Sequence, residues 1–273
     1  MTNSHLRPIP TPGVSFASAT GLPAVYLRGA RKSFGQNEIL RGVDLTISKG
    51  EVLSLLGPSG AGKSTILRCL ATLDKFDGGE LAYGSLRVCT NDPQGKAIYD
   101  REAMCKARMK FGIVFQDYNL FPHFSVMRNV TDAPICVQER DPKEVEEQAR
   151  GILRKLGLAE RADMVPCQLS GGQQQRVAIA RALCMNPNVL FFDEATSALD
   201  PKLTEEMLKI IRDLAGEGMA IGIVTHEVGF ARDVSDRIAV MLDGEIAEVG
   251  KPKDVLGSPR DERVAAFLSH SME

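Results

Sequence analysis

The strongest structural signal in the sequence is the nonapeptide Gly57-Pro58-Ser59-Gly60-Ala61-Gly62-Lys63-Ser64-Thr65. It fits Gly-x-x-x-x-Gly-Lys-Ser/Thr, the pattern of a phosphate-binding loop. The apolar run Val52–Leu56 precedes it and predicts a buried strand, and the segment from Thr65 to Leu70 predicts the start of a helix. A strand, a glycine-rich turn and a helix are the context that this motif requires. The sequence therefore predicts a nucleotide-binding site here, and an ordinary glycine turn is the weaker alternative.

The loop is suited to hold a triphosphate away from bulk water. Glycines lack Cβ atoms, so backbone N–H groups can curl around the β-phosphate. The first turn of the following helix adds free N–H groups and about half a positive charge. We expect Lys63 to reach the β- and γ-phosphates and the Ser64 hydroxyl to bind Mg²⁺.

Composition bounds the class of protein. The 273 residues are 44% hydrophobic and 25% charged, which suits one large domain or one domain with a lobe. The net charge of −2 gives no global field for nucleic acid or anionic lipid. The 6 cysteines are scattered without a Cys-x-x-Cys pair, which argues against zinc or a disulfide framework and fits a reducing cytosol.

No apolar run approaches the length of a membrane span. Residues 1–23 are Pro-rich without an apolar signal core, and we expect a disordered tail rather than a signal peptide.

Short strands and turns surround the loop. Alternating apolar runs from Val25 to Leu56 predict an antiparallel group of strands, and residues 78–89 predict another strand pair. Residues 90–110 predict a loop and a short helix. Phe34 is expected in a turn ahead of the phosphate loop, where it can stack on adenine for about 1 kcal/mol. The alternative for Phe34 is a place in the hydrophobic core.

An amide and a helical insertion follow. The apolar strand from Gly112 ends at Gln116, whose side chain can orient a water molecule or contact Mg²⁺; the alternative is a loop amide bonded to backbone. Asp141 as N-cap and Pro142 as the first residue predict a helix that Gly157 stops. Its apolar positions fall on one face, at Val145, Ala149, Leu153 and Leu156.

Ser170-Gly171-Gly172 at the start of the helix that runs to Met185 predicts a second anion site. One phosphate loop does not obviously need two such sites. We therefore expect the second site to serve a nucleotide bound to another copy of the protein.

Two carboxylates end the continuous apolar run from Asn188, which is typical of a buried parallel strand. Asp193 can hold Mg²⁺ through water. Glu194 can polarise the attacking water, which as general-base catalysis contributes about 10²–10⁴-fold. Two solvated acids closing a strand are the alternative.

His226 follows the next predicted strand, Ala220–Val224, and we expect it to contact the γ-phosphate rather than to be a surface histidine. Further on, Asp243-Gly244 predicts a hairpin turn, and a short helix is expected around Val264–Leu268.

These elements together resemble the ATP-binding-cassette (ABC) ATPases, over roughly residues 25–270. The motifs that carry the resemblance are Gly57–Thr65 (Walker A), Gln116 (Q-loop), Leu169–Gln173 (signature), Phe191–Glu194 (Walker B), Ser197–Asp200 (D-loop) and His226 (switch). The resemblance implies an α/β fold, a phosphate-loop ABC ATPase with a mixed core sheet, an antiparallel β subdomain and a helical subdomain. It implies an ATPase domain at 24–270, with the helical subdomain at about 120–186.

Finer features resemble the polar-amino-acid uptake ATPases. They are Leu120–His123, Leu169–Leu183, Thr196–Pro201 and Thr225–Ala231, and the chain ends soon after the catalytic core. Three features depart from that pattern: Ala195 stands where Pro is usual, residues 90–110 are long, and the Pro-rich start is extra. Another transporter type, such as lipoprotein or peptide export, is the alternative. DNA-repair ABC ATPases carry long coiled coils, which this chain lacks.

The resemblance implies that two copies pack head to tail around two ATP molecules, with Mg²⁺ held by Ser64, Gln116 and Asp193. In each site one copy would supply the loop Gly57–Thr65, Gln116, Glu194 and His226, with Phe34 against adenine. The other copy would supply Ser170, Gly171, Gly172 and Gln173 of the signature, and Asp200. The implied partners are a membrane permease at the cytoplasmic face of the cell membrane and an extracytoplasmic amino-acid-binding protein, with no nucleic acid.

Overall fold

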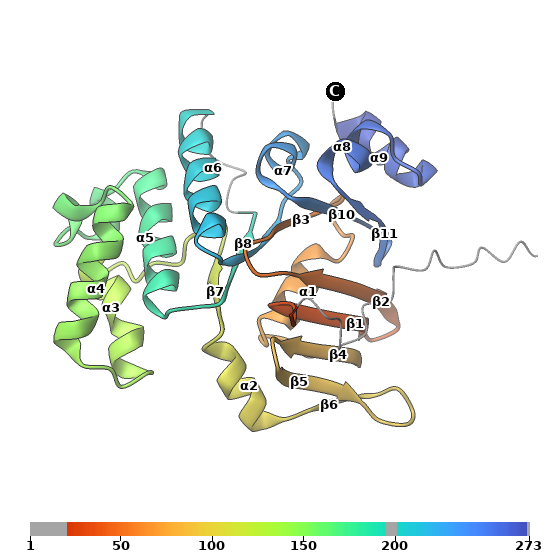
Figure 1. The fold of residues 1–273 in the computed structure, drawn as a ribbon, viewed down its shortest axis with the longest axis horizontal. Coiled ribbons are helices and arrows are strands. Elements are labelled where there is room, and N and C mark those ends of the chain that lie inside the picture. Colours follow the sequence, from red (N-terminus) through yellow and green to blue (C-terminus); the bar gives the residue numbers. More distant parts are fainter. Residues whose placement is uncertain (1–20, 195–200, 272–273) are drawn as a thin grey trace, which may run out of the picture.

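The computed structural model describes residues 21–194 and 201–271, which form two sheets with helices around them (Figure 1). The predicted tail lies outside these residues except for its last three, and so does Asp200. The architecture is the expected one, with a mixed core sheet, an antiparallel β subdomain and a helical subdomain.

The smaller sheet is antiparallel throughout and has the strand order β2-β1-β4-β5-β6. Its strands are β1 (Val25–Phe34), β2 (Asn37–Ile47), β4 (Gly78–Tyr83), β5 (Leu86–Asn91) and β6 (Ala97–Tyr99). The antiparallel group predicted from Val25 to Leu56 is therefore wrong for its last strand, because β3 (Val52–Leu56) belongs to the other sheet. Residues 90–110 hold β6 as well as the expected short helix, α2 (Arg101–Arg108).

The larger sheet has the order β11-β10-β3-β9-β8-β7. Its other strands are β7 (Phe111–Val114), β8 (Val189–Asp193), β9 (Ala220–Val224), β10 (Arg237–Leu242) and β11 (Glu245–Gly250). β10, β3, β9, β8 and β7 run parallel, and β11 pairs antiparallel with β10. The central strands are apolar and fully buried, as parallel strands covered on both faces require. The predicted Asp-Gly hairpin joins β10 to β11, with φ of 50° at Asp243 and 82° at Gly244.

Three helices form a separate layer at one end of the molecule: α3 (Val126–Cys136), α4 (Pro142–Lys155) and α5 (Gly171–Cys184) (Figure 1). The predicted start of α4 is confirmed, since the Asp141 carboxylate accepts from the backbone N–H groups of Lys143 and Glu144. The predicted apolar face of α4 is buried with residues of α3 and α5. Two short 3₁₀ turns, η1 (Ala159–Arg161) and η2 (Pro166–Gln168), lead into α5.

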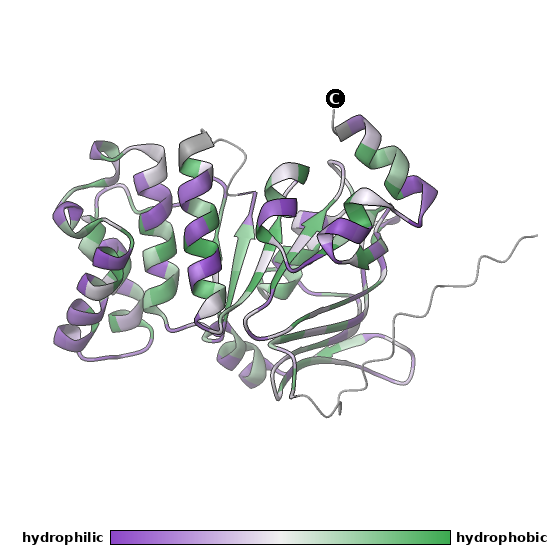
Figure 2. Ribbon diagram, turned by 45° about the horizontal axis from the view of Figure 1, so that its top comes forward, coloured by the Kyte–Doolittle hydropathy of each residue, from purple (hydrophilic) through white to green (hydrophobic). Residues whose placement is uncertain are grey.

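The remaining helices cover the larger sheet and extend to the end of the chain. They are α1 (Lys63–Leu70), α6 (Pro201–Gly216), α7 (Val228–Val234), α8 (Pro252–Gly257) and α9 (Glu262–Ser271). Figure 2 shows apolar strands between helices that alternate apolar and polar residues, which is the pattern of helices packed on a buried sheet. Among the described residues, no helix combines the length and the apolar character needed to cross a bilayer.

Candidate active site

Four neighbouring parallel strands carry the predicted site residues at one edge of the larger sheet. The phosphate loop follows β3, His226 lies two residues after β9, Asp193 ends β8, and Gln116 lies two residues after β7. These strands are adjacent in the order β3-β9-β8-β7 and all run parallel. Their carboxyl ends therefore meet at the same edge, where ligands bind in sheets of this kind.

The glycines of the phosphate loop are required by close backbone approaches. A Cβ atom on Gly57 would lie 2.2 Å from the Met241 carbonyl oxygen. Gly62 caps α1 with a φ of 103°, and a Cβ there would lie 3.1 Å from the Ile39 carbonyl oxygen. Side chains at these positions would push the loop away from β10 and β2. Glycine at positions 57 and 62 thus allows the loop to pack closely, and it also leaves the backbone N–H groups of the loop accessible.

Lys63 is the first residue of α1, and its side chain folds back over the loop. Its ammonium group donates to the carbonyl oxygens of Gly57 at 2.8 Å and Pro58 at 2.9 Å. Burial lowers the pKa of Lys63, and the carboxylates of Glu194 and Asp193 oppose that shift. A buried cation between loop carbonyls and two acids is placed to exchange these partners for the oxygens of a phosphate.

Asp193 presents a buried oxygen that lacks a partner. Among the described residues, its Oδ1 atom is the only buried side-chain oxygen or nitrogen that makes no hydrogen bond. Burial raises the pKa of this carboxyl, and the neighbouring Glu194 raises it further. An unsatisfied carboxylate oxygen in such surroundings fits a divalent cation, since oxygen donors are what Mg²⁺ prefers. The Ser64 and Gln116 side chains are exposed and available to the same ligand.

Glu194 and His226 face each other across neighbouring strands. Glu194 has a left-handed φ of 48°, and its backbone N–H donates to the Val224 carbonyl oxygen at 2.9 Å. Its Oε1 atom lies 3.7 Å from Nδ1 of His226, which is exposed. The strained backbone turns Glu194 out of the line of β8, a feature typical of functional positions. The pairing of β8 with β9 brings His226, two residues after β9, beside the two acids at the end of β8.

The signature residues lie elsewhere in the fold. Ser170 caps α5: its hydroxyl accepts from the Gln173 backbone N–H, and the Gln173 side chain accepts from the Ser170 N–H. Ser170 and Gly171 are exposed, and Gly172 is packed against Leu203 of α6. In Figure 1, β7 and β8 lie between α1 and α5. The structure therefore gathers the phosphate loop, Gln116, Asp193, Glu194 and His226 at one edge, and leaves Ser170–Gln173 apart from them.

Phe34 is exposed at the end of β1, rather than inside a turn or in the core. Its relative exposure is 51%, and the Lys32 ammonium lies 5.0 Å from the centre of its ring. An exposed aromatic ring is available for stacking on a base. The remaining predicted site residue, Asp200, is in the part of the chain that the structure does not describe.

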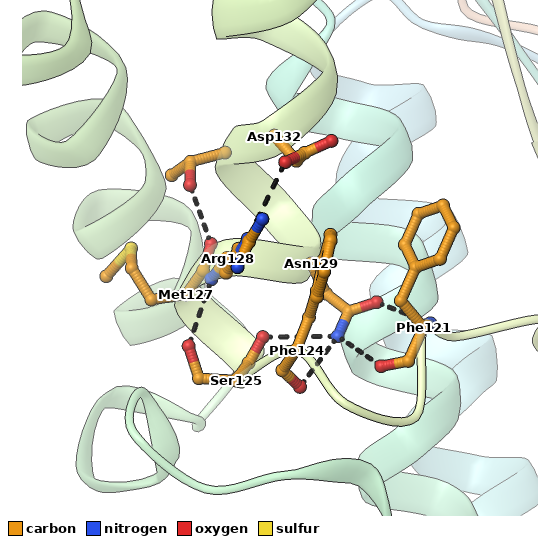
Figure 3. Close-up of polar contacts among 8 residues, drawn as sticks. Phe121, Phe124, Ser125, Met127, Arg128, Asn129 and Asp132 are labelled. Atoms are coloured by element: carbon orange, nitrogen blue, oxygen red, sulfur yellow. Dashed lines mark hydrogen bonds and ion pairs between the residues drawn. The ribbon is translucent and has the colours of Figure 1, made fainter.

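Sequence reasoning missed the side chains that hold the segment after Gln116. Arg181 of α5 donates to the carbonyl oxygens of Tyr118 and Asn119, and Asn129 of α3 binds the main chain of residues 121–125 (Figure 3). An arginine on a helix and an asparagine inside one are both commonly exposed. No apolar spacing pointed to Asn129, because polar residues such as Asn129 and Thr131 fill buried positions of α3 and hide its apolar face.

Sequence comparison identifies the family. A family model described as "ABC transporter" matches residues 40–197. The L-cystine import ATP-binding protein TcyC of Bacillus subtilis is 46% identical, over 89% of this chain and 96% of that protein. The glutamine transport ATP-binding protein GlnQ of Escherichia coli is also 46% identical, over 90% of this chain and 99% of that protein.

Solved structures agree with this result. MJ0796, a bacterial ABC transporter cassette solved as a dimer, is 36% identical and superposes with a TM-score of 0.71, over 84% of this chain and 98% of that one. The protein cbiO1 from Clostridium perfringens, part of the ABC transporter complex cbiONQ, is 28% identical with a TM-score of 0.76, over 90% of this chain and 99% of that one. The chain therefore belongs to the ABC transporter family and is one of its ATP-binding subunits, similar in sequence to those of amino-acid transport systems.

Proposed function

We propose that this chain hydrolyses ATP to power the uptake of polar amino acids through a separate membrane permease. The ATPase activity is supported by one observation: four polar side chains lie together at one edge of the sheet, those of Lys63, Asp193, Glu194 and His226. The substrate class rests on relatives that are about half identical over almost the whole chain and transport cystine, arginine or glutamine.

Each catalytic side chain has a role that follows from its place. The backbone N–H groups of Gly60–Thr65 and the Lys63 ammonium bind the phosphates, and Lys63 leaves the Gly57 and Pro58 carbonyls to do so. Glu194 takes the proton of the attacking water, and His226 across from it contacts the γ-phosphate. Gln116 orients the water from the neighbouring strand end.

Mg²⁺ is the cation that we propose for this site. When bound, it would supply positive charge that offsets the negative charge of the phosphates during hydrolysis. Ser64, Gln116 and Asp193 would hold it, and the unpartnered Oδ1 of Asp193 is the observation that supports this set. Among the described residues, no cluster of three or more His, Cys, Asp or Glu side chains could hold a metal.

Two copies complete two sites. The signature start is exposed and apart from the phosphate loop of its own chain, so it is free to meet the γ-phosphate held by a second copy. A C2 dimer would place Ser170–Gln173 and Asp200 of each copy against the nucleotide of the other. ATP then joins the subunits, and hydrolysis separates them. The dimeric structure of MJ0796 supports this arrangement.

The closing and opening of the dimer can drive transport only if the dimer moves a second protein. We propose a permease at the cytoplasmic face of the cell membrane, docked near residues 116–123 and the α3–α5 layer, with an extracytoplasmic binding protein that delivers the amino acid. Phe121 is exposed there with a relative exposure of 50%. Exposed aromatic side chains are favoured anchors in protein interfaces.

The test is reconstitution with the permease. The chain is co-purified with the permease from the same gene cluster, placed in vesicles, and assayed for ATPase activity with the binding protein and a panel of cystine, arginine, glutamine, glucose and a tripeptide. Stimulation by one or more polar amino acids, and its absence in a Glu194→Gln transporter, is the expected result. Stimulation by the tripeptide alone would replace the proposed substrate class.

A further inference from the structure

The end of β1 that carries Phe34 extends past the strand beside it. The pairing of β1 with β4 ends at Arg31, which lies opposite Gly78. Asp77, the residue before β4, adds one more main-chain bond, from its N–H to the Arg31 carbonyl oxygen at 2.7 Å. The residues that lead from Arg31 to Phe34 therefore run beyond the start of β4.

The carboxylate of Asp77 takes the place of the next residue of β4. Its Oδ2 accepts from the Ser33 backbone N–H at 2.6 Å. A hydrogen bond to a charged acceptor is shorter and stronger than one between neutral groups. The Asp77 carbonyl oxygen accepts in turn from the Ala97 N–H at 2.8 Å, at the start of β6. Asp77 thus ties the residue before Phe34 to the starts of β4 and β6.

Lys32 connects the same carboxylate with the Phe34 ring. Its ammonium nitrogen lies 3.6 Å from Oδ1 of Asp77 and over the ring, 5.0 Å from the ring centre. The Lys32 side chain is only 12% exposed, which limits the other positions open to its ammonium group. A cation over an aromatic ring is attracted by the negative charge of the ring face. Asp77 therefore holds the ammonium group in place, and the ammonium group favours one orientation of the ring.

Orientation matters for Phe34 because half of its surface is exposed. The ring lies just before the turn at Gly35, where φ is 63°. An exposed side chain loses rotamer freedom when a ligand orders it, and a side chain that is already held binds with a smaller loss. The ammonium group of Lys32 covers one face of the ring, so the opposite face is left for a flat ligand.

We propose that Asp77 and Lys32 are positioning residues for the nucleotide base. Asp77 aligns the end of β1 through the Ser33 N–H, and Lys32, held by Asp77, orients the Phe34 ring so that its free face receives adenine. Both residues act through Phe34 and need no contact with the nucleotide. The proposal rests on the proposed function only in taking ATP as the ligand, whereas the alignment of β1 by Asp77 is a property of the subunit alone.

Hydrogen exchange of the purified full chain, resolved at single residues by NMR, tests the alignment. Asp77→Ala removes the acceptor of the Ser33 N–H and should speed exchange of that amide about tenfold or more. Asp77→Asn keeps a neutral oxygen acceptor and should lie between Asp77→Ala and wild type. Unchanged exchange of the Ser33 amide in Asp77→Ala would overturn the alignment.

Asp44→Ala is the matched control for the exchange experiment. The Asp44 Oδ1 accepts from the Gly29 backbone N–H at 2.6 Å, so this carboxylate also binds β1, but near the middle of the strand. Asp44→Ala should speed exchange at Gly29 and leave both the Ser33 amide and ATP binding as in wild type. Faster exchange at Ser33 in this control would show that the effect is not specific to Asp77.

Titration with ATP and with inorganic tripolyphosphate, which has no base, tests the positioning of the ring. Asp77→Ala and Lys32→Met should each weaken ATP binding about twofold to fivefold and leave tripolyphosphate binding unchanged. Lys32→Arg keeps a cation and should stay close to wild type. When Phe34→Ala is already present, Asp77→Ala and Lys32→Met should have no further effect, because residues that act through one ring are not additive.

Three binding results would overturn the positioning role. They are a loss that is as large for tripolyphosphate as for ATP, a full further loss in the Phe34→Ala background, and an unchanged affinity for ATP in Phe34→Ala alone. Hydrolysis decides the proposed function separately. Wild-type protein that shows the expected binding pattern but does not hydrolyse ATP would remove the proposed function and leave the positioning role in place.

Discussion

The Lys63 ammonium donates to the Gly57 carbonyl oxygen at 2.8 Å, so the lysine of the phosphate loop is bound by the loop itself. The bond keeps a buried positive charge solvated by backbone dipoles until a phosphate replaces them. It also closes the loop around the position where a β-phosphate is expected.

Removing this charge should weaken nucleotide binding without unfolding the protein. Lys63→Ala loses a charge-assisted hydrogen bond to phosphate, and we expect the Kd for ATP to rise about 10–100-fold. Calorimetric titration with ATP measures the change. Lys75→Ala is the control, because Lys75 is exposed and lies over the Tyr99 ring. An unchanged Kd in Lys63→Ala would show that the lysine does not bind the phosphates.

Asp193→Asn should stabilise the nucleotide-free protein while harming its function. The folded-state pKa of Asp193 is raised by burial and by Glu194, so the fold favours the protonated acid. The stability from this group is full below the unfolded Asp pKa of about 3.9 and is lost as pH rises through the higher folded value. Near pH 7 the buried charge is a cost that asparagine removes. We expect a Tm higher by a few degrees, with a smaller difference near pH 4.

The same variant should lose the benefit of Mg²⁺. Wild-type protein should bind ATP more tightly with Mg²⁺ than with a chelator, and Asp193→Asn should show little difference between the two. Thermal scans at pH 4 and pH 7 and titrations with and without the cation measure both effects. A lower Tm at pH 7, or an unchanged response to Mg²⁺, would contradict the assigned role.

The two signature glycines should respond differently to alanine. A Cβ atom on Gly172 would lie 2.6 Å from Cδ2 of Leu203, so Gly172→Ala overpacks the contact between α5 and α6 and should cost about 1–3 kcal/mol of stability. The nearest atom to a Cβ on Gly171 is the Tyr118 hydroxyl oxygen at 4.0 Å, so Gly171→Ala should leave the Tm of the monomer close to wild type. Gly171→Ala should instead weaken ATP-driven dimerisation, which sedimentation measures. Equal dimerisation in Gly171→Ala and wild type would count against close contact at this glycine.

Phe34→Ala tests the adenine contact. Loss of the stacking ring should weaken ATP binding about fivefold, which corresponds to about 1 kcal/mol. Binding of inorganic tripolyphosphate, which has no base, should not change. Leu73→Ala is a matched control, since Leu73 is an equally exposed apolar residue with a relative exposure of 56%. Equal losses for ATP and tripolyphosphate would mean that Phe34 acts on the fold of the loop instead.

The sequence revealed the parts whose chemistry is local. The Gly57–Thr65 loop, the acids that end β8 and the capped start of α4 each follow from residue types at short spacing. The sheet to which β3 belongs was mispredicted, because an apolar strand does not name its neighbours. Helix α3 was missed, since polar Asn129 and Thr131 and the interior Pro134 occupy buried positions and hide its apolar face. Their burial makes sense only once the loop carbonyls that Asn129 binds are in place.

The direction of the Lys63 side chain was also outside the reach of the sequence. The motif predicts a lysine that binds phosphate, whereas the structure shows it on the Gly57 and Pro58 carbonyls. A buried ammonium group takes the hydrogen-bond acceptors within its reach, as most buried polar groups do.

In the proposed dimer each ATP is enclosed by the phosphate loop of one subunit and the signature of the other. Sedimentation of slow-hydrolysing variants in ATP measures whether this enclosure forms. Glu194→Gln should keep ATP binding, slow turnover by about 10²–10⁴-fold, and sediment as a dimer in ATP. Adding Ser170→Arg to Glu194→Gln places a long cation at the exposed start of α5, and this double variant should bind ATP with the same affinity yet remain a monomer. A stable ATP-dependent dimer of the double variant would show that the signature of one copy does not meet the nucleotide of the other.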